Sequence, residues 1–177
     1  MLTIDPARAL LLVIDFQARL MPAIHEGEAA MHNAAKLIEA AGLLGIARLV
    51  TEQNPKGLGT TVAGLPLAGT PVFEKQHFDA CREPGFLDLI PQDAHVVVVG
   101  CEAHVCVLQS VLGLLHAGRK VFVVRDAIGS RRAENRDAGV ERMARHGAEI
   151  VTTEMALFEW LGSAQHPQFK PAVALIK

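Results

Sequence analysis

The sequence has no apolar run long enough to cross a membrane, no large excess of either charge and only three cysteines. A membrane-spanning helix needs about 20 consecutive apolar residues. The first apolar stretch, residues 9–14, is ended by Asp15. It is also too short for the core of a secretory signal peptide. We therefore expect no membrane partner.

The charge balance and the cysteine count argue against a nucleic-acid-binding protein and a disulfide-rich protein. Lys and Arg number 17 and Asp and Glu number 19, which gives a formal net charge of −2. A chain this close to neutral offers no electrostatic reason to expect a nucleic-acid partner. The three cysteines, Cys81, Cys101 and Cys106, are an odd number, which fits a reducing compartment better than a disulfide framework. A cytoplasmic location is expected.

Motifs for several common chemistries are missing. No pair of histidines has the spacing of a zinc-binding helix, and no Cys-x-x-Cys occurs. Gly57 and Gly59 lack the third glycine and the strand-to-helix context of a dinucleotide fingerprint. The phosphate-binding loop and the Gly-x-Ser-x-Gly pattern are absent as well. NAD, ATP and serine-hydrolase chemistry therefore have no support, and we expect no cofactor.

What is present predicts one α/β domain over residues 1–177. Half of the residues are hydrophobic, which is enough for a substantial core. Short runs rich in Val, Ile and Leu predict buried strands, and stretches with helical spacing lie between them. Such alternation is typical of a Rossmann-like three-layer α/β/α fold with a six-stranded parallel sheet. The strands are expected at 9–14, 48–51, 71–73, 95–99, 120–124 and 149–151, and the helices at 30–44, 104–116, 131–146 and 155–161.

Ligands of parallel sheets bind beyond the carboxyl ends of the strands, and reactive side chains follow several of the expected strands. Cys106 is the sharpest candidate, because it falls in the first turn of a helix that follows a strand. The free N–H groups there lower the pKa of a thiol and can hold an oxyanion. The alternative is that Cys106 is a small buried apolar residue. The long irregular segment 53–70 is expected to be a functional loop.

Three charged residues also follow strands. Asp15 ends an otherwise apolar strand, which suggests either a general base with a raised pKa or an N-cap or turn former for residues 16–20. Lys75 is either a surface lysine or the group that holds charge on a neighbouring thiol and carboxylate. For Asp126 we favour a turn or capping role over catalysis.

Several blocks of the sequence resemble the isochorismatase-like cysteine hydrolase family, in its metal-free branch. They match in order and cover nearly the whole chain. The blocks are Leu11-Leu-Val-Ile-Asp15-Phe-Gln, Val72-Phe-Glu-Lys75, Gly100-Cys-Glu-Ala-His-Val-Cys106-Val and Val123-Val-Arg-Asp126-Ala.

The resemblance implies a six-stranded parallel sheet and a catalytic triad of Asp15, Lys75 and Cys106. Cys106 would be the nucleophile, Asp15 would take its proton, and Lys75 would hold the charged pair in place. The family's non-proline cis peptide maps to the Cys101–Glu102 bond. The backbone N–H groups of Glu102 and Cys106 would then form the oxyanion hole.

The sequence departs from the metal-binding members of that family. Their Asp-x-His pattern near the second strand is replaced here by Thr51-Glu-Gln-Asn-Pro. We therefore expect no metal and a substrate other than nicotinamide. The side chains expected to contact the substrate are Phe16, Gln53, Asn54, Phe78 and His104.

The resulting prediction is a hydrolase that cleaves a C–N bond of a small amide through a thioester on Cys106. The alternatives are a vinyl-ether hydrolase of the isochorismatase type, a non-catalytic oligomeric scaffold, and a redox sensor that uses Cys101 and Cys106. A homo-oligomer is expected from the high apolar content and the apolar tail 169–176.

Overall fold

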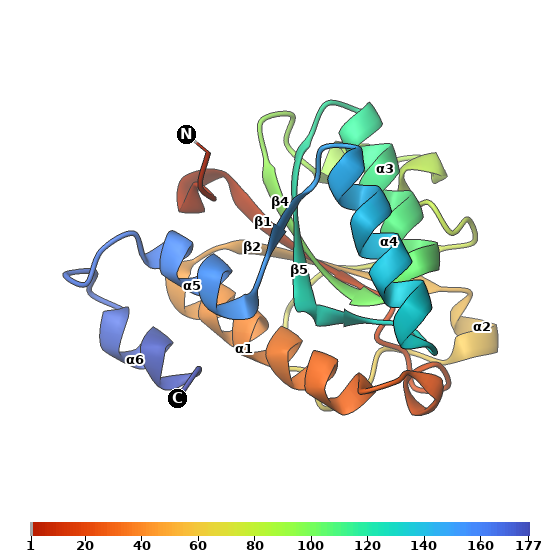
Figure 1. Cartoon of the computed structure of the whole chain (residues 1–177), viewed down its shortest axis with the longest axis horizontal. Coiled ribbons are helices and arrows are strands. Elements are labelled where there is room, and N and C mark those ends of the chain that lie inside the picture. The colour runs from red at the N-terminus through yellow and green to blue at the C-terminus, as the bar shows by residue number, and fades with distance from the viewer. Residues whose placement is uncertain (1) are drawn as a thin grey trace.

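The computed structural model describes residues 2–177 and contains a six-stranded parallel sheet with helices on both faces (Figure 1). This confirms the predicted three-layer architecture. The strands pair in the order β3-β2-β1-β4-β5-β6. In such a sheet the strand order reverses between β1 and β4, the usual place for a ligand site. The strands are β1 (Ala9–Ile14), β2 (Ala47–Gln53), β3 (Val72–Lys75), β4 (His95–Cys101), β5 (Lys120–Gly129) and β6 (Glu149–Val151).

The helices form two layers around this sheet. In Figure 1, α3 and α4 lie together on one side and α1 and α5 on the other. None of the helices within residues 2–177 is both long enough and apolar enough to span a bilayer. The helices are α1 (Gly27–Leu44), α2 (Pro55–Leu58), α3 (Leu108–His116), α4 (Ala133–Arg145), α5 (Thr153–Leu161) and α6 (Phe169–Ala174).

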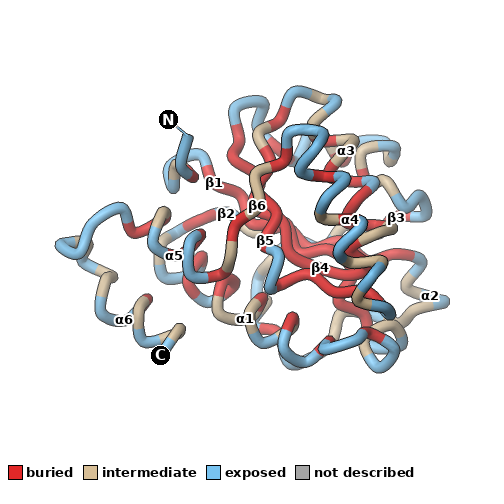
Figure 2. The backbone as a smooth tube through the Cα atoms, in the orientation of Figure 1, coloured by how far each residue is buried: buried red, intermediate tan, exposed pale blue. Residues whose placement is uncertain are grey.

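The core lies on both faces of the central strands. All six residues of β1 and all seven of β4 are buried, as expected for strands covered by helices on each side. Leu11 and Val13 pack into the cluster under α1 and α5, whereas Leu12 and Ile14 pack into the cluster under α3 and α4. Figure 2 shows these buried strands between exposed helical surfaces.

Four strands extend further along the chain than the sequence pattern predicted, and one of them, β4, ends at Cys101 rather than at Val99. β2 reaches Gln53 and β3 reaches Lys75, so both residues lie within strands rather than after them. β5 continues to Gly129 because a register shift near Val98 and Gly100 lets its second half pair with the end of β4. Asp126 therefore lies within β5, and the expectation that it follows this strand and forms a turn is wrong.

Gly100 allows the ends of β1 and β4 to approach each other closely. Its φ angle is +143°, and a β-carbon at this position would lie 2.2 Å from the carbonyl oxygen of Ile14. Only glycine accepts this conformation and this contact. The chain therefore brings the residue after β1 and the segment after β4 side by side.

The tail differs from the prediction. It forms α6, and its residues Ala172, Val173 and Ile176 pack against the core of their own chain. The apolar tail is thus satisfied within the chain and is no evidence for a neighbour. The large apolar side chains that remain exposed include Met155 and Phe158 of α5.

Candidate active site

A buried ion pair joins the ends of β1 and β3. Lys75 Nζ lies 2.7 Å from Asp15 Oδ2, and both side chains are fully buried. Two charges so enclosed persist only when each is paired and hydrogen-bonded. The predicted neighbourhood of Asp15 and Lys75 is confirmed by this contact. A surface position for Lys75 is excluded.

The backbone turns sharply at Asp15, which has a left-handed φ of +51°. Its N–H donates to the carbonyl oxygen of Thr51, and the Thr51 hydroxyl donates to Asp15 Oδ1 at 2.7 Å. Asp15 is thus held from both its backbone and its side chain, with one oxygen toward Thr51 and the other toward Lys75. No helix begins at Asp15, so a role as a helix cap finds no support. The alternative of a turn former is supported, because the Gln17 N–H donates to the Asp15 carbonyl oxygen at 2.8 Å.

Gln53 lies at the centre of the site, at the end of β2. Its Oε1 accepts a hydrogen bond from Lys75 Nζ at 2.7 Å and lies 3.9 Å from Cys106 Sγ. Its Nε2 donates to the carbonyl oxygen of Gln76 at 2.7 Å. The oxygen and the nitrogen of this side-chain amide therefore both form hydrogen bonds within the protein. Direct substrate binding by Gln53 stays a prediction, and the contacts seen here give its side chain a positioning role within the protein.

Cys106 lies in a π-helical turn, Ala103–Val107, that leads into α3. The peptide bond between Cys101 and Glu102, just before this turn, is cis, as the family resemblance implied. Burial raises the pKa of the Cys106 thiol to about 12, and the Asp15 carboxylate acts in the same direction, while Lys75 opposes them. The expected lowering of this pKa is therefore wrong, because burial outweighs the helix end.

The segment after β4 is tied to the segment after β5. The buried Glu102 carboxylate accepts from Arg131 Nε at 2.6 Å, and Arg131 is itself largely exposed. His104 Nδ1 lies 3.0 Å from Ser130 Oγ. These two contacts fix the π-helical turn that carries Cys106 against the end of β5. His104 is half-buried beside this turn.

The other proposed substrate contacts lie apart from the Asp15–Lys75 pair or have structural roles. Phe16 is completely buried in the core cluster under α1, so it has no surface to offer a substrate in this conformation. Asn54 is exposed, has a left-handed φ of +39° and forms the turn into α2. Phe78 is 52% exposed in the loop after β3. Asn54, Phe78 and His104 stay predictions as substrate contacts.

Asp126 has a structural role, but it lies in a strand and caps α5 instead of forming a turn before the next helix. Its Oδ1 accepts from the backbone N–H of Thr153 at 2.8 Å and from the Thr153 hydroxyl at 3.1 Å. Asn33 donates to the carbonyl oxygen of Asp126. Asp126 thereby joins β5 to the first residue of α5 and to α1.

Two residues of the site were missed by the sequence reading. Thr51 holds Asp15 through its hydroxyl. Gln17 holds Gln53 with two hydrogen bonds, since Gln17 Oε1 accepts from the Gln53 N–H and Gln17 Nε2 donates to the Gln53 carbonyl oxygen. Gln17 Nε2 also donates to the carbonyl oxygen of Gly59, which joins the 53–70 loop to the site. The sequence did contain a signal for both residues. Thr51 lies two positions before Gln53 and Gln17 lies two positions after Asp15, so each shares a side of an extended chain with a candidate residue.

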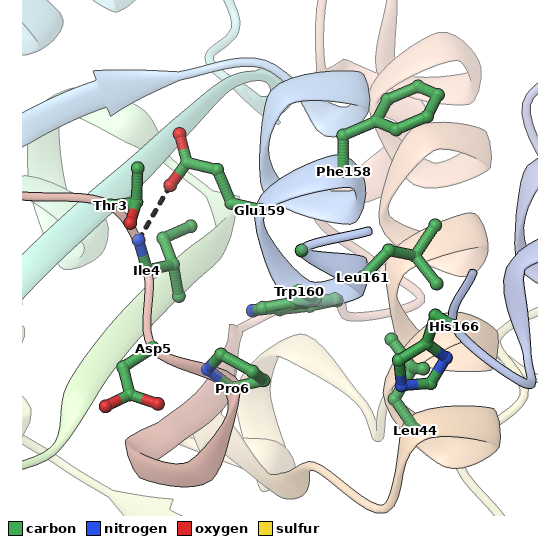
Figure 3. A pocket seen from close by; sticks show the side chains of 11 residues that line it. Thr3, Ile4, Asp5, Pro6, Leu44, Phe158, Glu159, Trp160, Leu161 and His166 are labelled. Atoms are coloured by element: carbon green, nitrogen blue, oxygen red, sulfur yellow. Dashed lines mark hydrogen bonds between the residues drawn. The ribbon is translucent and has the colours of Figure 1, made fainter. Parts of the chain in front are cut away.

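A cavity of about 610 Å³ lies at the opposite end of the strands, beside the segment that leads into β1 (Figure 3). It is formed by the segment before β1, the end of α1 and helix α5, and the buried Trp160 lines it. Its lining contains no cysteine, lysine or serine. The residue chemistry therefore favours the carboxyl ends of the strands, at Asp15, Lys75 and Cys106, over this cavity as the candidate site.

Among residues 2–177, no group of three or more His, Cys, Asp or Glu side chains is arranged to hold a metal ion. All three cysteines are free thiols. Burial raises the pKa of Cys101 well above its usual range and that of Cys81 to about 12.

Comparison with known proteins adds independent evidence. Residues 9–155 match the isochorismatase domain. Isochorismatase domain-containing protein 1 of Danio rerio is 37% identical over 98% of this chain, but the chain spans only 62% of that protein's length. Isochorismatase domain-containing protein 2 of Bos taurus is 34% identical, over 97% of this chain and 84% of that protein. A solved structure described as MAR1 ribonuclease from Caenorhabditis elegans is 38% identical with a TM-score of 0.90, over 98% of this chain and 92% of that one.

Proposed function

The chain belongs to the isochorismatase domain family of hydrolases, and we propose that it cleaves a C–N bond of a small amide with Cys106 as nucleophile. One observation carries the proposal. The Lys75 ammonium group donates both to the Asp15 carboxylate and to Gln53 Oε1, and the Cys106 thiol lies 3.9 Å from that same Gln53 oxygen. A nucleophile beside a base that a third group orients is the usual arrangement for covalent catalysis.

In the proposed first step, Sγ of Cys106 attacks the amide carbonyl carbon and its proton passes to Asp15. The high pKa of the thiol means that the resting enzyme holds a protonated sulfur. Proton transfer must therefore accompany the attack, which is the task of a general base within reach. Lys75 stabilises the carboxylate before the transfer and the negative charge on sulfur during it.

The intermediate then collapses to a thioester as the C–N bond breaks. The proton held by Asp15 passes to the leaving nitrogen, which departs as ammonia or an amine. A water molecule then attacks the thioester carbonyl while Asp15 takes one of its protons, and the acid product leaves as Cys106 regains its hydrogen. The carbonyl oxygen, negative in both steps, would be held by the backbone N–H groups of Glu102 and Cys106.

Ammonia release from a panel of small primary amides tests this proposal. We expect release by the unaltered chain and a loss of at least about a thousandfold in Cys106→Ala, since covalent catalysis is then removed. Rapid quenching with a substrate found in this way should give a mass increase equal to the acyl group on the peptide containing Cys106. The matched control is Cys101→Ala, another buried cysteine, which should keep both signals.

Two results contradict amide cleavage through Cys106. Full ammonia release by Cys106→Ala would remove the nucleophile. Turnover of a vinyl ether without any adduct would favour the isochorismatase-type alternative. The ribonuclease name of the C. elegans structure makes RNA a further control substrate. With a formal charge of −2 the chain lacks the basic excess typical of RNA binding, so we expect no cleavage of single-stranded RNA that depends on Cys106.

A homo-oligomer in the cytoplasm remains part of the proposal. The exposed Met155 and Phe158 on α5 support an interface on that helix. Light scattering of the unaltered chain and of Phe158→Glu tests it. We expect the substitution to lower the measured mass, and a monomer in both samples would contradict the oligomer.

A further inference from the structure

The amide of Gln53 is fixed at every polar group. Its backbone N–H and carbonyl are bonded to Gln17, and its Nε2 donates to the carbonyl oxygen of Gln76. Because that carbonyl accepts only a donor, Nε2 must face it, and Oε1 must therefore face Lys75. The residue is only 6% exposed, so no bulk water competes for these bonds.

The orientation of Oε1 has two effects on its neighbours. It takes a hydrogen bond from Lys75 at 2.7 Å, which directs the ammonium group between Asp15 and Cys106. It also accepts from the Cys106 thiol at 3.9 Å between sulfur and oxygen. An acceptor that faces a thiol stabilises its protonated form, because a thiolate has no hydrogen to donate.

We infer that Gln53 is a positioning residue: its amide oxygen holds the Lys75 ammonium beside the Cys106 thiol and keeps that thiol protonated in the resting enzyme. This inference rests on the proposed role of Cys106 and deepens it. Gln53 acts through Lys75 and Cys106 and does not itself touch the substrate. A neutral amide suits this position, since a carboxylate there would repel the thiolate that forms during attack.

Two substitutions at position 53 change the chemistry in opposite directions. Gln53→Glu places a negative charge beside the sulfur, and a rise of one unit in the thiol pKa makes the thiolate about tenfold rarer. Gln53→Met has a similar length but no acceptor, so the protonated thiol loses its hydrogen bond and Lys75 gains a free donor for the thiolate. Loss of one such bond corresponds to a rise of about twofold to tenfold in the thiolate population.

The experiment measures the rate at which iodoacetamide modifies Cys106 in the intact chain at pH 8, by peptide mass spectrometry. Sulfur displaces iodide in this reaction, so the rate follows the thiolate population. We expect Gln53→Glu to react about tenfold more slowly and Gln53→Met about twofold to tenfold faster than the unaltered chain. The thiolate absorbance of each variant against its own Cys106→Ala partner, over a pH series, separates ionisation from access of the reagent.

A purely structural role predicts a different pattern. If Gln53 only fills space, both substitutions loosen the site and both accelerate modification, and the positioning role is overturned. Equal rates in all three chains overturn it as well. The matched control is Gln165→Glu, the same substitution on an exposed loop between α5 and α6, which should leave the rate unchanged.

A failure of the positioning role of Gln53 can be distinguished from a failure of the proposed amide cleavage. Alkylation reports on the thiol without any substrate. If Cys106→Ala retains amide cleavage while the two Gln53 variants show opposite rates, the proposed reaction is wrong and the positioning role stands. If Cys106→Ala is inactive and the Gln53 variants show equal rates, the reverse holds.

Discussion

Replacing Lys75 by methionine tests whether the two central charges are held as a pair. Both side chains are fully buried, and Nζ lies 2.7 Å from Asp15 Oδ2. Removing one partner leaves an uncompensated buried charge, which typically costs about 3–5 kcal/mol of unfolding free energy. Since Thr51 still donates to the other Asp15 oxygen, we expect the lower end of that range, about 3 kcal/mol.

Urea denaturation measures this loss directly. Trp160 is the only tryptophan and is 1% exposed, so its fluorescence reports unfolding without a tyrosine background. With a slope of about 2 kcal/mol per molar urea, the midpoint of Lys75→Met should fall by about 1.5 M. The exposed Lys170→Met is the matched control and should change the free energy by less than about 0.5 kcal/mol.

The double variant Asp15→Asn with Lys75→Met tests whether the unpaired Asp15 charge causes the loss of stability in Lys75→Met. Asparagine tolerates the left-handed φ at this position and still accepts from Thr51. With both charges gone, we expect at least half of the lost stability to return. A double variant as unstable as the sum of its two single substitutions would refute the pairing. So would a loss below about 1 kcal/mol in Lys75→Met alone.

The remaining predictions concern other contacts. Gly100→Ala should lower the melting temperature by more than about 10 °C, because the added β-carbon would lie 2.2 Å from the Ile14 carbonyl oxygen. A melting temperature within about three degrees of the unaltered chain would contradict this. Asp126→Ala should lower the free energy of unfolding, measured by urea denaturation, by about 1–2 kcal/mol, because the N–H of Thr153 at the start of α5 loses its acceptor. Asp126→Asn keeps an acceptor oxygen and should lower it much less. Equal losses in the two variants would disprove the capping role. Glu83 has a pKa of about 2, below its usual 4.5, chiefly because backbone N–H groups donate to it. Between these pH values the unfolded chain binds more protons, so Glu83 stabilises the fold above pH 4.5 and this contribution is lost as the pH falls toward 2. The melting-temperature gap between the unaltered chain and Glu83→Gln should therefore narrow from pH 6 to pH 3, and a constant gap would rule this out.

The sheet and the reactive residues were predictable from sequence because they depend on local patterns. Buried parallel strands are apolar throughout, so β1 and β4 stand out as continuous runs, and a charged residue that ends such a run, as Asp15 does, is conspicuous. The motif resemblance then grouped Asp15, Lys75 and Cys106. The predicted ends of the strands were wrong where they depend on the pairing register between neighbouring strands. The extension of β5 past Asp126 follows from a register shift against β4, and no feature of the β5 sequence announces it.

Side-chain partners were equally out of reach. Gln53 was assigned to substrate because a polar residue near a pocket is expected to bind one. Its actual neighbours depend on Gln17 and Gln76, which lie in other segments of the chain. The thiol pKa was misjudged for a related reason. A helix end is visible in the sequence, whereas the burial that outweighs it exists only once the strands have assembled.

The raised pKa of the three thiols has a consequence for the lifetime of the protein under oxidative stress. Peroxides attack thiolates, and susceptibility to sulfenic acid formation follows thiolate character and exposure. Folding raises the pKa of Cys81, Cys101 and Cys106 alike, so the native chain offers an oxidant less thiolate than the same chain unfolded. At Cys101, which is fully buried and outside the proposed reaction, damage is then limited by how often the molecule opens, and oxidised Cys101 records past openings of the fold.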